Sequence, residues 1–386
     1  MNKKFYDYAG AIHFHSNYSY DGNVSINRIV ENAKSTGLDF IMLTDHFRLD
    51  AKRDGHEGWH GDVLLIVGEE ISPSYNHLLA FGIREPIVTK RYEDKPQEYI
   101  DAVNNQGGFG IIAHPDHEGT KLFGVKPFPW TDWSVKGYTG MSIWDLQTDW
   151  QDKLKGYPSA ILSYFFPSYC LSGAREGTLK RWDELNRNKR VTGIGEIDNH
   201  NAKRRFLGLN FYIFNFRYAF KTIRTHILTE KPFNRNPLTH PSPSRGEGEG
   251  GGEDIETVYQ AIKEGRVYVA HEYWHSAKGF SFSIGDGENE VGIGGEFILK
   301  DKPASIKVNL PIHGLIRVIQ DGKKIYESSP SPLPPPQVGR KKRKGASNGF
   351  GFSFEIKEKG VYRIEVYQKI FMKYRPWIYS NHINVK

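Results

Sequence analysis

Histidine and carboxylate side chains recur along this sequence close to the ends of predicted strands. They lie in the segments His13-x-His15, Tyr20-Asp21-Gly22, Thr44-Asp45-His46, Gly68-Glu69-Glu70, His77, Ala113-His114-Pro115 and Ile194 to His200. Imidazole and carboxylate groups are the usual ligands of Zn²⁺, Mn²⁺ and Fe²⁺, and no thiolate accompanies them. One such histidine is more simply a hydrogen-bonded polar residue, but a series of them favours a divalent metal centre.

The elements that position these residues alternate between strands and helices from residue 9 to about 200. Apolar runs predict strands at 10–15, 39–44, 63–67, 77–81, 109–113 and 191–194, and helices are predicted at 26–35 and 97–105. Successive strand–helix–strand units give parallel strands whose carboxyl ends meet at one edge, so an α/β barrel is favoured over an open sheet. His13 and His15 are predicted to share one face of the first strand, because alternate residues point the same way.

From residue 266 the apolar pattern changes to a period of two, which is typical of strands with one buried face. Asp321-Gly322 separates two such runs and predicts a tight hairpin. These features predict an α/β barrel domain at 1–265 followed by a small β-sandwich domain at 266–386. Stretches rich in Pro, Gly and charge at about 234–253 and 329–348 are predicted to be disordered insertions without chemistry.

Composition excludes several classes of protein. The chain has 386 residues, 38% of them hydrophobic, which is enough for a substantial core. Its single cysteine, Cys170, excludes a disulfide framework and favours a reducing, cytoplasmic location. No apolar run is long enough to cross a bilayer and no secretory signal is evident, so no membrane partner is expected. The run from Arg340 to Lys344 supplies five of the seven net positive charges, which makes a nucleic-acid groove unlikely.

The motifs together resemble the PHP (polymerase and histidinol phosphatase) superfamily of metal-dependent hydrolases. The resemblance rests on His13-x-His15, Asp21-Gly22, Thr44-Asp45-His46, Gly68-Glu69-Glu70-Ile71, Ile112-Ala113-His114-Pro115 and Asp198-x-His200. It implies a distorted (β/α)7 TIM-like barrel that binds two or three divalent metals. The β-rich tail resembles the accessory domain of the branch that contains carbamate-ester hydrolases. Ser142 and Asp145 depart from a family pattern that often has Glu and Asn at these positions.

Carried over by position, the resemblance assigns a metal-binding role to nine residues. His13, His15, Glu70 and Asp198 would hold the first metal, and Glu70 would bridge to a second that His77 and His114 complete. Asp21, His46 and His200 would hold the third. Glu70 is preferred to Glu69 because the family pattern is Gly-x-Glu followed by an aliphatic residue.

Such a centre would lower the pKa of a shared water and polarise the bond under attack. The reaction expected is hydrolysis of a phosphomonoester or phosphodiester in a small molecule or nucleotide. Hydrolysis of a carbamate or carboxylic ester at the same metals, or a non-catalytic binding protein with structural metals, are the alternatives. His117 is the candidate general acid, although a metal-bound water or a plain loop histidine would also fit. The oligomeric state is not fixed by the sequence.

Overall fold

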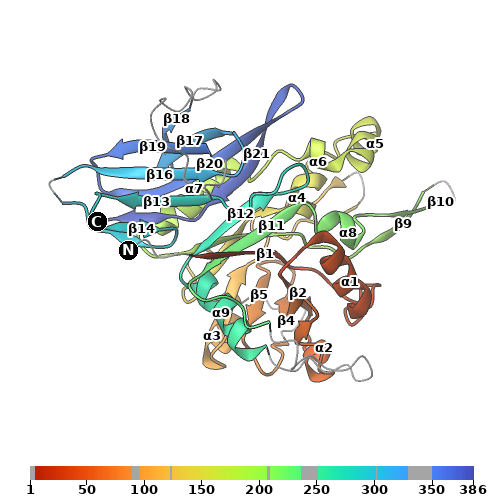
Figure 1. The fold of residues 1–386 in the computed structure, drawn as a ribbon. Helices are drawn as coiled ribbons and strands as arrows, with labels where there is room; N and C mark the ends of the chain where they lie inside the picture. Colours follow the sequence, from red (N-terminus) through yellow and green to blue (C-terminus); the bar gives the residue numbers. More distant parts are fainter. Residues whose placement is uncertain are drawn as a thin grey trace.

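The structure is a computed structural model, and it describes residues 5–88, 95–121, 124–206, 209–235, 251–300, 302–328 and 350–386 (Figure 1). The helices in these ranges are α1 (Ile26–Thr36), α2 (Asp50–Arg53), α3 (Pro96–Asn105), α4 (Leu146–Gln151), α5 (Tyr157–Phe165), α6 (Pro167–Cys170), α7 (Glu176–Asn186), α8 (Phe216–Ala219) and α9 (Gly252–Lys263). The predicted helices at 26–35 and 97–105 are confirmed as α1 and α3. Gly37 ends α1 in the left-handed conformation, with φ of 71°.

The strands of the first two thirds of the chain are β1 (Tyr6–Ile12), β2 (Phe40–His46), β3 (Gly58–His60), β4 (Val63–Ile71), β5 (Leu78–Phe81), β6 (Phe109–Ile112), β7 (Gly140–Asp145), β8 (Thr192–Glu196), β9 (Lys203–Phe206), β10 (Leu209–Tyr212), β11 (Ile223–Thr229) and β12 (Val267–His271). The strands of the last third are β13 (Ser281–Gly285), β14 (Glu290–Gly292), β15 (Glu296–Phe297), β16 (Ala304–Leu310), β17 (Leu315–Gln320), β18 (Lys323–Glu327), β19 (Phe350–Ile356), β20 (Gly360–Ile370), β21 (Lys373–Ser380) and β22 (Ile383–Val385).

One sheet carries the residues expected at the site, in the order β12-β11-β1-β2-β4-β5-β6-β7-β8. The pairs β1–β2, β2–β4, β6–β7 and β7–β8 are parallel, as the strand–helix pattern predicts. The strand β5 is antiparallel to both of its neighbours. No helix lies between β4 and β5, so the chain turns back directly instead of crossing over.

The expected closed barrel is not confirmed, because the sheet does not close with a continuous ladder. Its last strand, β8, approaches β1 through one isolated bridge between Phe14 and Asn199. A hydrogen bond from the Ile197 N–H to the Ile12 carbonyl, 3.1 Å long, joins the same two segments. The architecture is therefore a mixed α/β fold with a large sheet that contains both parallel and antiparallel pairs and does not close.

The C-terminal strands continue the same sheet. The strand β12 pairs with β11 on one side and with β21 on the other, so hydrogen bonds run across the boundary expected at residue 266. A separate four-stranded sheet, β14-β13-β16-β19, packs against β17 and β20 through one apolar core that includes Phe282, Ile306, Ile364 and Val366. The predicted separate β-sandwich is not confirmed, because the β12–β21 pairing makes β20, β21 and β22 part of the first sheet.

The predicted hairpin at Asp321-Gly322 is confirmed. Gln320 pairs with Lys323, and Asp321 and Gly322 have φ of 51° and 80°. These are the left-handed angles of a two-residue turn that follows the twist of the strands. Most of both predicted insertions, residues 236–250 and 329–349, lies outside the described residues.

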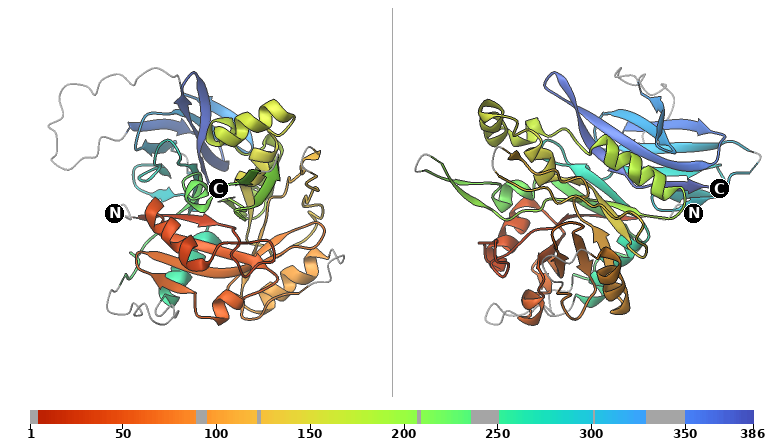
Figure 2. Two further views of the ribbon diagram at one scale, coloured as in Figure 1. Left: turned by 90° about the vertical axis from the view of Figure 1, so that its right-hand side faces the viewer. Right: turned by 180° about the vertical axis from the view of Figure 1, so that it is seen from behind.

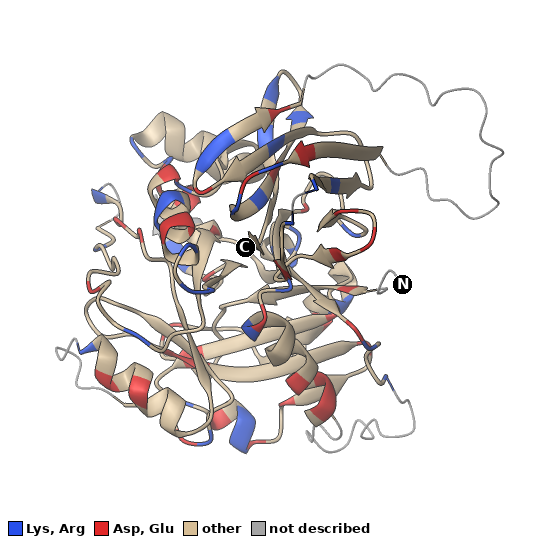
Figure 3. Ribbon diagram, turned by 90° about the vertical axis from the view of Figure 1, so that its left-hand side faces the viewer, with Lys and Arg blue, Asp and Glu red and all other residues tan. Residues whose placement is uncertain are grey.

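Charged residues of both signs are spread over the described part of the chain. Figure 3 shows Lys and Arg segments interspersed with Asp and Glu segments. Among the described residues, no helix combines the length and the apolar character needed to cross a bilayer.

Candidate metal centre

The structure brings all nine predicted ligand residues together at one end of the strands. His13 and His15 follow β1, Asp21 precedes α1, and His46 and Glu70 lie at the ends of β2 and β4. His77 precedes β5, His114 follows β6, and Asp198 and His200 follow β8. Seven of them contribute to the wall of one pocket with a volume of about 1200 Å³, and His13 and His15 lie fully buried beneath it. The seven are Asp21, His46, Glu70, His77, His114, Asp198 and His200.

Both oxygens of the Glu70 carboxylate face imidazole nitrogens. Oε2 lies 3.3 Å from Nε2 of His13 and 3.4 Å from Nε2 of His15. Oε1 lies 2.8 Å from Nδ1 of His77 and 3.3 Å from Nε2 of His114. Glu70 therefore stands between two sets of nitrogen donors, which is the arrangement a carboxylate that bridges two cations requires.

Asp198 completes the donor set on the Oε2 side. Its Oδ1 lies 3.4 Å from Nε2 of His13 and 3.5 Å from Nε2 of His15. Two imidazoles and two carboxylates thus point at one small volume. Four donors of these kinds match the usual first coordination shell of Zn²⁺ or Mn²⁺.

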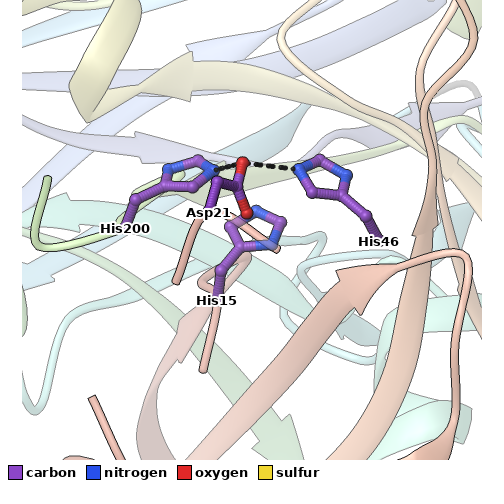
Figure 4. A group of neighbouring side chains, drawn as sticks. All are labelled: His15, Asp21, His46 and His200. Carbon is purple, nitrogen blue, oxygen red and sulfur yellow. Dashed lines mark hydrogen bonds and ion pairs between the residues drawn. The ribbon is translucent and has the colours of Figure 1, made fainter. Parts of the chain in front are cut away.

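A third set lies around Asp21 (Figure 4). Its Oδ2 is 3.1 Å from Nε2 of His46 and 3.1 Å from Nε2 of His200. The His15 ring lies between them, with its centre 4.4 Å from that of His46 and 4.1 Å from that of His200. His46 also reaches Glu70, because its Nδ1 is 3.0 Å from Oε2. The three donor sets are therefore connected through shared side chains.

Three of the nine residues adopt left-handed backbone conformations. The φ angles are 68° at His13, 24° at His114 and 40° at Asp198. This corrects the prediction that His13 and His15 alternate within a strand, since β1 ends at Ile12. The two rings still converge, with centres 5.3 Å apart, because the turn at His13 re-aims its side chain. Strained backbone of this kind persists where the surroundings enforce it, most often at functional sites.

Several buried polar atoms of this cluster lack hydrogen-bond partners among the described residues and could bind a cation. Nε2 of His13, Nε2 of His15 and Oε2 of Glu70 are buried and have no hydrogen-bond partner among the described residues. Buried polar atoms without partners are costly, and cations at these positions would satisfy them. The donor set therefore fits divalent metals, in line with the prediction from the sequence.

Burial and the neighbouring charged groups together shift the pKa values of the histidines in this cluster. Burial, together with the nearby His200 and His46, lowers the pKa of His15 to about 3. The His15 ring is therefore neutral and keeps a nitrogen lone pair free. Burial also lowers the pKa of His46, but Glu70 and Asp21 more than offset this and raise it to about 10. A divalent cation would replace the protons that these carboxylates otherwise attract.

Glu196 is a buried carboxylate in the segment Ile194 to His200, and the sequence alone predicts no role for it. Its Oε2 accepts a hydrogen bond from Nδ1 of His13 at 2.8 Å, and its Oε1 accepts one from the His114 N–H at 2.6 Å. The contact fixes the His13 tautomer with Nε2 directed at Glu70. In the same way, Nε2 of His77 donates to the Pro73 carbonyl at 2.9 Å, which leaves Nδ1 facing Glu70. Such outer contacts orient metal-binding imidazoles.

His117, the candidate general acid, lies on the pocket wall with its ring centre 5.7 Å from that of His114. Its Nδ1 accepts from the Phe128 N–H at 3.2 Å, and its Nε2 donates to Oε1 of Gln151 at 3.1 Å. Burial, with His114 nearby, lowers its pKa to about 4. The His117 ring is therefore neutral near neutral pH, and both of its nitrogens are in hydrogen bonds, so no free proton is available for donation. Its role as a general acid stays a prediction.

Two other expectations concern neighbouring carboxylates. Glu69 does not line the pocket and accepts the Ile87 N–H at 2.7 Å, so the preference for Glu70 as the ligand stays a prediction. Asp145 caps α4 by accepting hydrogen bonds from the Gln147 and Thr148 N–H groups. Neither Ser142 nor Asp145 lines the large pocket.

Comparison with known proteins finds a protein family that matches part of the chain. The family model of the PHP domain matches residues 11–121. This segment contains seven of the nine predicted ligand residues, and Asp198 and His200 lie beyond it. No curated protein matches the chain.

Two solved structures are similar at low identity. One is a two-domain protein from Bacteroides vulgatus described as containing a predicted PHP-like metal-dependent phosphoesterase. It is 14% identical with a TM-score of 0.43, over 97% of this chain and 95% of the other. The second, from Bifidobacterium adolescentis, is proposed to be a metal-dependent phosphoesterase; it is 16% identical with a TM-score of 0.32, over 53% of this chain and 92% of the other. The family model thus identifies residues 11–121 as a PHP domain.

Proposed function

We propose that the protein is a metal-dependent phosphoesterase acting on a phosphomonoester or phosphodiester. The observation that carries this proposal is the Glu70 carboxylate, which faces nitrogen donors of different histidines with each of its two oxygens. Sites that hold cations on both sides of one carboxylate suit phosphoryl transfer, because attacking and leaving oxygens can each be stabilised. The relatives described as metal-dependent phosphoesterases point in the same direction.

The chain's own residues would bind and orient the reactants. When bound, two or three divalent cations (Zn²⁺, Mn²⁺ or Fe²⁺) would supply Lewis acidity and an activated water. Glu70, His13, His15 and Asp198 would hold one of them at the floor of the pocket. Lys126 and Arg204 line the same pocket and carry positive charge toward an incoming phosphate.

The wall of the pocket is largely apolar and would restrict access of water. Phe128, Trp150, Leu154 and Ile161 contribute to it. Electrostatic attraction between cations and a phosphate strengthens where water is excluded. We assign residues 1–265 to the catalytic unit, with the curved sheet as a distorted (β/α)7 barrel, and residues 266–386 to an accessory β-domain.

The test is metal-dependent turnover of chromogenic substrates. Purified protein is stripped with a chelator, reloaded with Zn²⁺, Mn²⁺ or Fe²⁺, and assayed on an aryl phosphomonoester, an aryl phosphodiester and an aryl carbamate. We expect hydrolysis of a phosphoester that chelator abolishes and metal restores, and that His13→Ala eliminates. His313→Ala, which changes a histidine outside the pocket, is the matched control. A metal-loaded protein that cleaves only the carbamate would contradict the proposal.

A further inference from the structure

Large apolar side chains are exposed beside the pocket, on α5, on the residue after it and on the turn between β20 and β21. Phe165 is 66% exposed and Met372 is 87% exposed. The residues of this apolar patch are Tyr157, Ile161, Leu162, Phe165, Phe166, Phe371 and Met372. Soluble proteins rarely expose contiguous apolar surface of this kind unless something binds there.

Aromatic contacts link α5 to β10 and α6 to the β20–β21 turn. The rings of Tyr164 in α5 and Phe211 in β10 lie 5.6 Å apart. The rings of Tyr169 in α6 and Phe371 lie 5.8 Å apart, and the Arg375 guanidinium covers Tyr169 at 4.7 Å. Figures 1 and 2 show α5, the β9–β10 hairpin and the β20–β21 hairpin projecting on the same side of the molecule.

The β20–β21 turn has an unusual sequence for its geometry. Ile370 pairs with Lys373, so Phe371 and Met372 form the whole two-residue turn, and Phe371 has φ of 53°. Turns of this length favour Asn and Gly, because left-handed angles strain a bulky residue. An exposed Phe-Met turn therefore lowers the stability of the fold. Folding alone does not explain why apolar residues occupy the tip of this turn.

The segments that form the patch carry basic but no acidic side chains. Residues 156–171, 203–213 and 366–380 contain no Asp or Glu. Lys155 precedes α5, Lys369 and Lys373 flank the β20–β21 turn, and all three are exposed. Exposed apolar side chains flanked by lysines are typical of segments that enter the headgroup region of an anionic bilayer.

The pocket of the metal centre opens through this surface. Tyr157, Ile161, Tyr164 and Phe165 line the pocket that also contains Glu70. A molecule held at the patch would therefore have a direct apolar path to the ligand cluster.

We propose that the apolar patch docks on the surface of an anionic lipid bilayer. The helix α5 and the Phe371–Met372 turn would insert among the headgroups while the lysines contact lipid phosphates, without any segment crossing the membrane. This replaces the expectation, drawn from the lack of an apolar run, that no membrane partner exists. Resting on the proposed phosphoesterase function, the substrate class would be a phosphoester of a membrane amphiphile, which enters the pocket from the bilayer.

The test is flotation of the full-length protein with vesicles of phosphatidylcholine alone and of phosphatidylcholine mixed with phosphatidylglycerol. We expect flotation with the mixed vesicles, weakened by high salt because the lysines contribute. The double variant Leu162→Ser/Met372→Ser should lower the apparent affinity about tenfold or more, because both apolar contacts are lost. Neither side chain lines the pocket, so turnover of a soluble aryl phosphoester should be unchanged.

The matched control is Ile298→Ser/Ile325→Ser, which removes apolar side chains that are 60% and 41% exposed elsewhere on the surface. Equal flotation of the two double variants, or no flotation of the unchanged protein, would overturn the docking proposal. Concentration-dependent dimerisation abolished by Leu162→Ser/Met372→Ser, without vesicle binding, would instead assign the patch to a second copy of the chain. Because flotation does not require catalysis, its failure is distinguishable from failure of the proposed phosphoesterase.

Discussion

Nδ1 of His13 donates a hydrogen bond to Oε2 of Glu196 at 2.8 Å, and both residues are fully buried. The bond joins the end of β1 to the end of β8, two strands that the sheet itself connects only through isolated contacts. It also fixes the direction in which His13 presents Nε2. Glu196 is therefore a positioning residue of the metal centre.

We expect Glu196→Gln to weaken metal affinity about 10–100-fold, the usual cost of losing an outer contact to a metal-binding imidazole. The amide keeps the size of the side chain but removes the charge that stabilises the His13 N–H. Competition with a chromogenic chelator would measure the change. Glu69→Gln, which alters the adjacent buried carboxylate of β4 outside the pocket, is the control and should leave affinity unchanged.

Asp21→Asn should remove one metal and leave the others. Asp21 pairs with His46 and His200 of the third set, whereas Glu70 contacts the histidines of both other sets. Elemental analysis of protein reconstituted with excess metal should show one metal fewer per chain than the unchanged protein. Loss of every metal from Asp21→Asn would show that the sets do not fill separately.

A buried ion pair joins the two parts of the chain. Arg363 in β20 donates to Asp183 in α7 through Nε at 2.7 Å and through Nη2 at 2.9 Å, and His382 contacts the same carboxylate at 2.7 Å. Arg363→Ala should lower the free energy of unfolding by about 3–5 kcal/mol, because Asp183 is left buried without its main partner.

Denaturant unfolding would measure this loss. The control is Arg317→Ala, which breaks a half-exposed pair with Glu327 and should cost no more than about 1 kcal/mol. A similar small loss for both variants would show that the β20–α7 contact contributes little to stability.

The pH dependence of stability should reflect His226. This buried imidazole lies 2.8 Å from Asp7 and 3.3 Å from Glu272. Burial lowers its pKa, but Asp7 and Glu272 more than offset this and raise it to about 9. Because the folded pKa exceeds the ordinary value near 6.5, the stabilisation is complete below that pH and is lost as pH rises through about 9.

The loss should be on the order of 2–3 kcal/mol in the free energy of unfolding for a shift of this size. Denaturation series between neutral pH and about pH 10 would measure it. His226→Gln should flatten this part of the profile, since glutamine does not titrate. Parallel profiles for the two proteins would contradict the assignment.

Much of the site could be predicted from the sequence because its residues follow strands with clear apolar periodicity. His46 and Glu70 lie at the ends of β2 and β4, close to where the apolar runs end. The role of Glu196 could not be predicted, because its partner His13 is 183 residues away and nothing local marks the contact. The partners of His226 were missed for the same reason.

The domain boundary was harder to predict than the strands themselves. The apolar alternation from residue 266 correctly indicates strands, but periodicity does not specify which strands pair. The ladder between β12 and β21 brings together residues about a hundred positions apart in the sequence, and only non-local packing selects it. The exposure of the apolar side chains of α5 could not be predicted either, because apolar residues in a helix usually indicate a buried face.

The most direct test of the central claim is anomalous diffraction from crystals grown with Mn²⁺ or Zn²⁺. The account predicts peaks on both sides of the Glu70 carboxylate, one among His13, His15 and Asp198 and one beside His77 and His114. Crystals that show no anomalous peak at Glu70, or show metal bound only elsewhere on the chain, would contradict it.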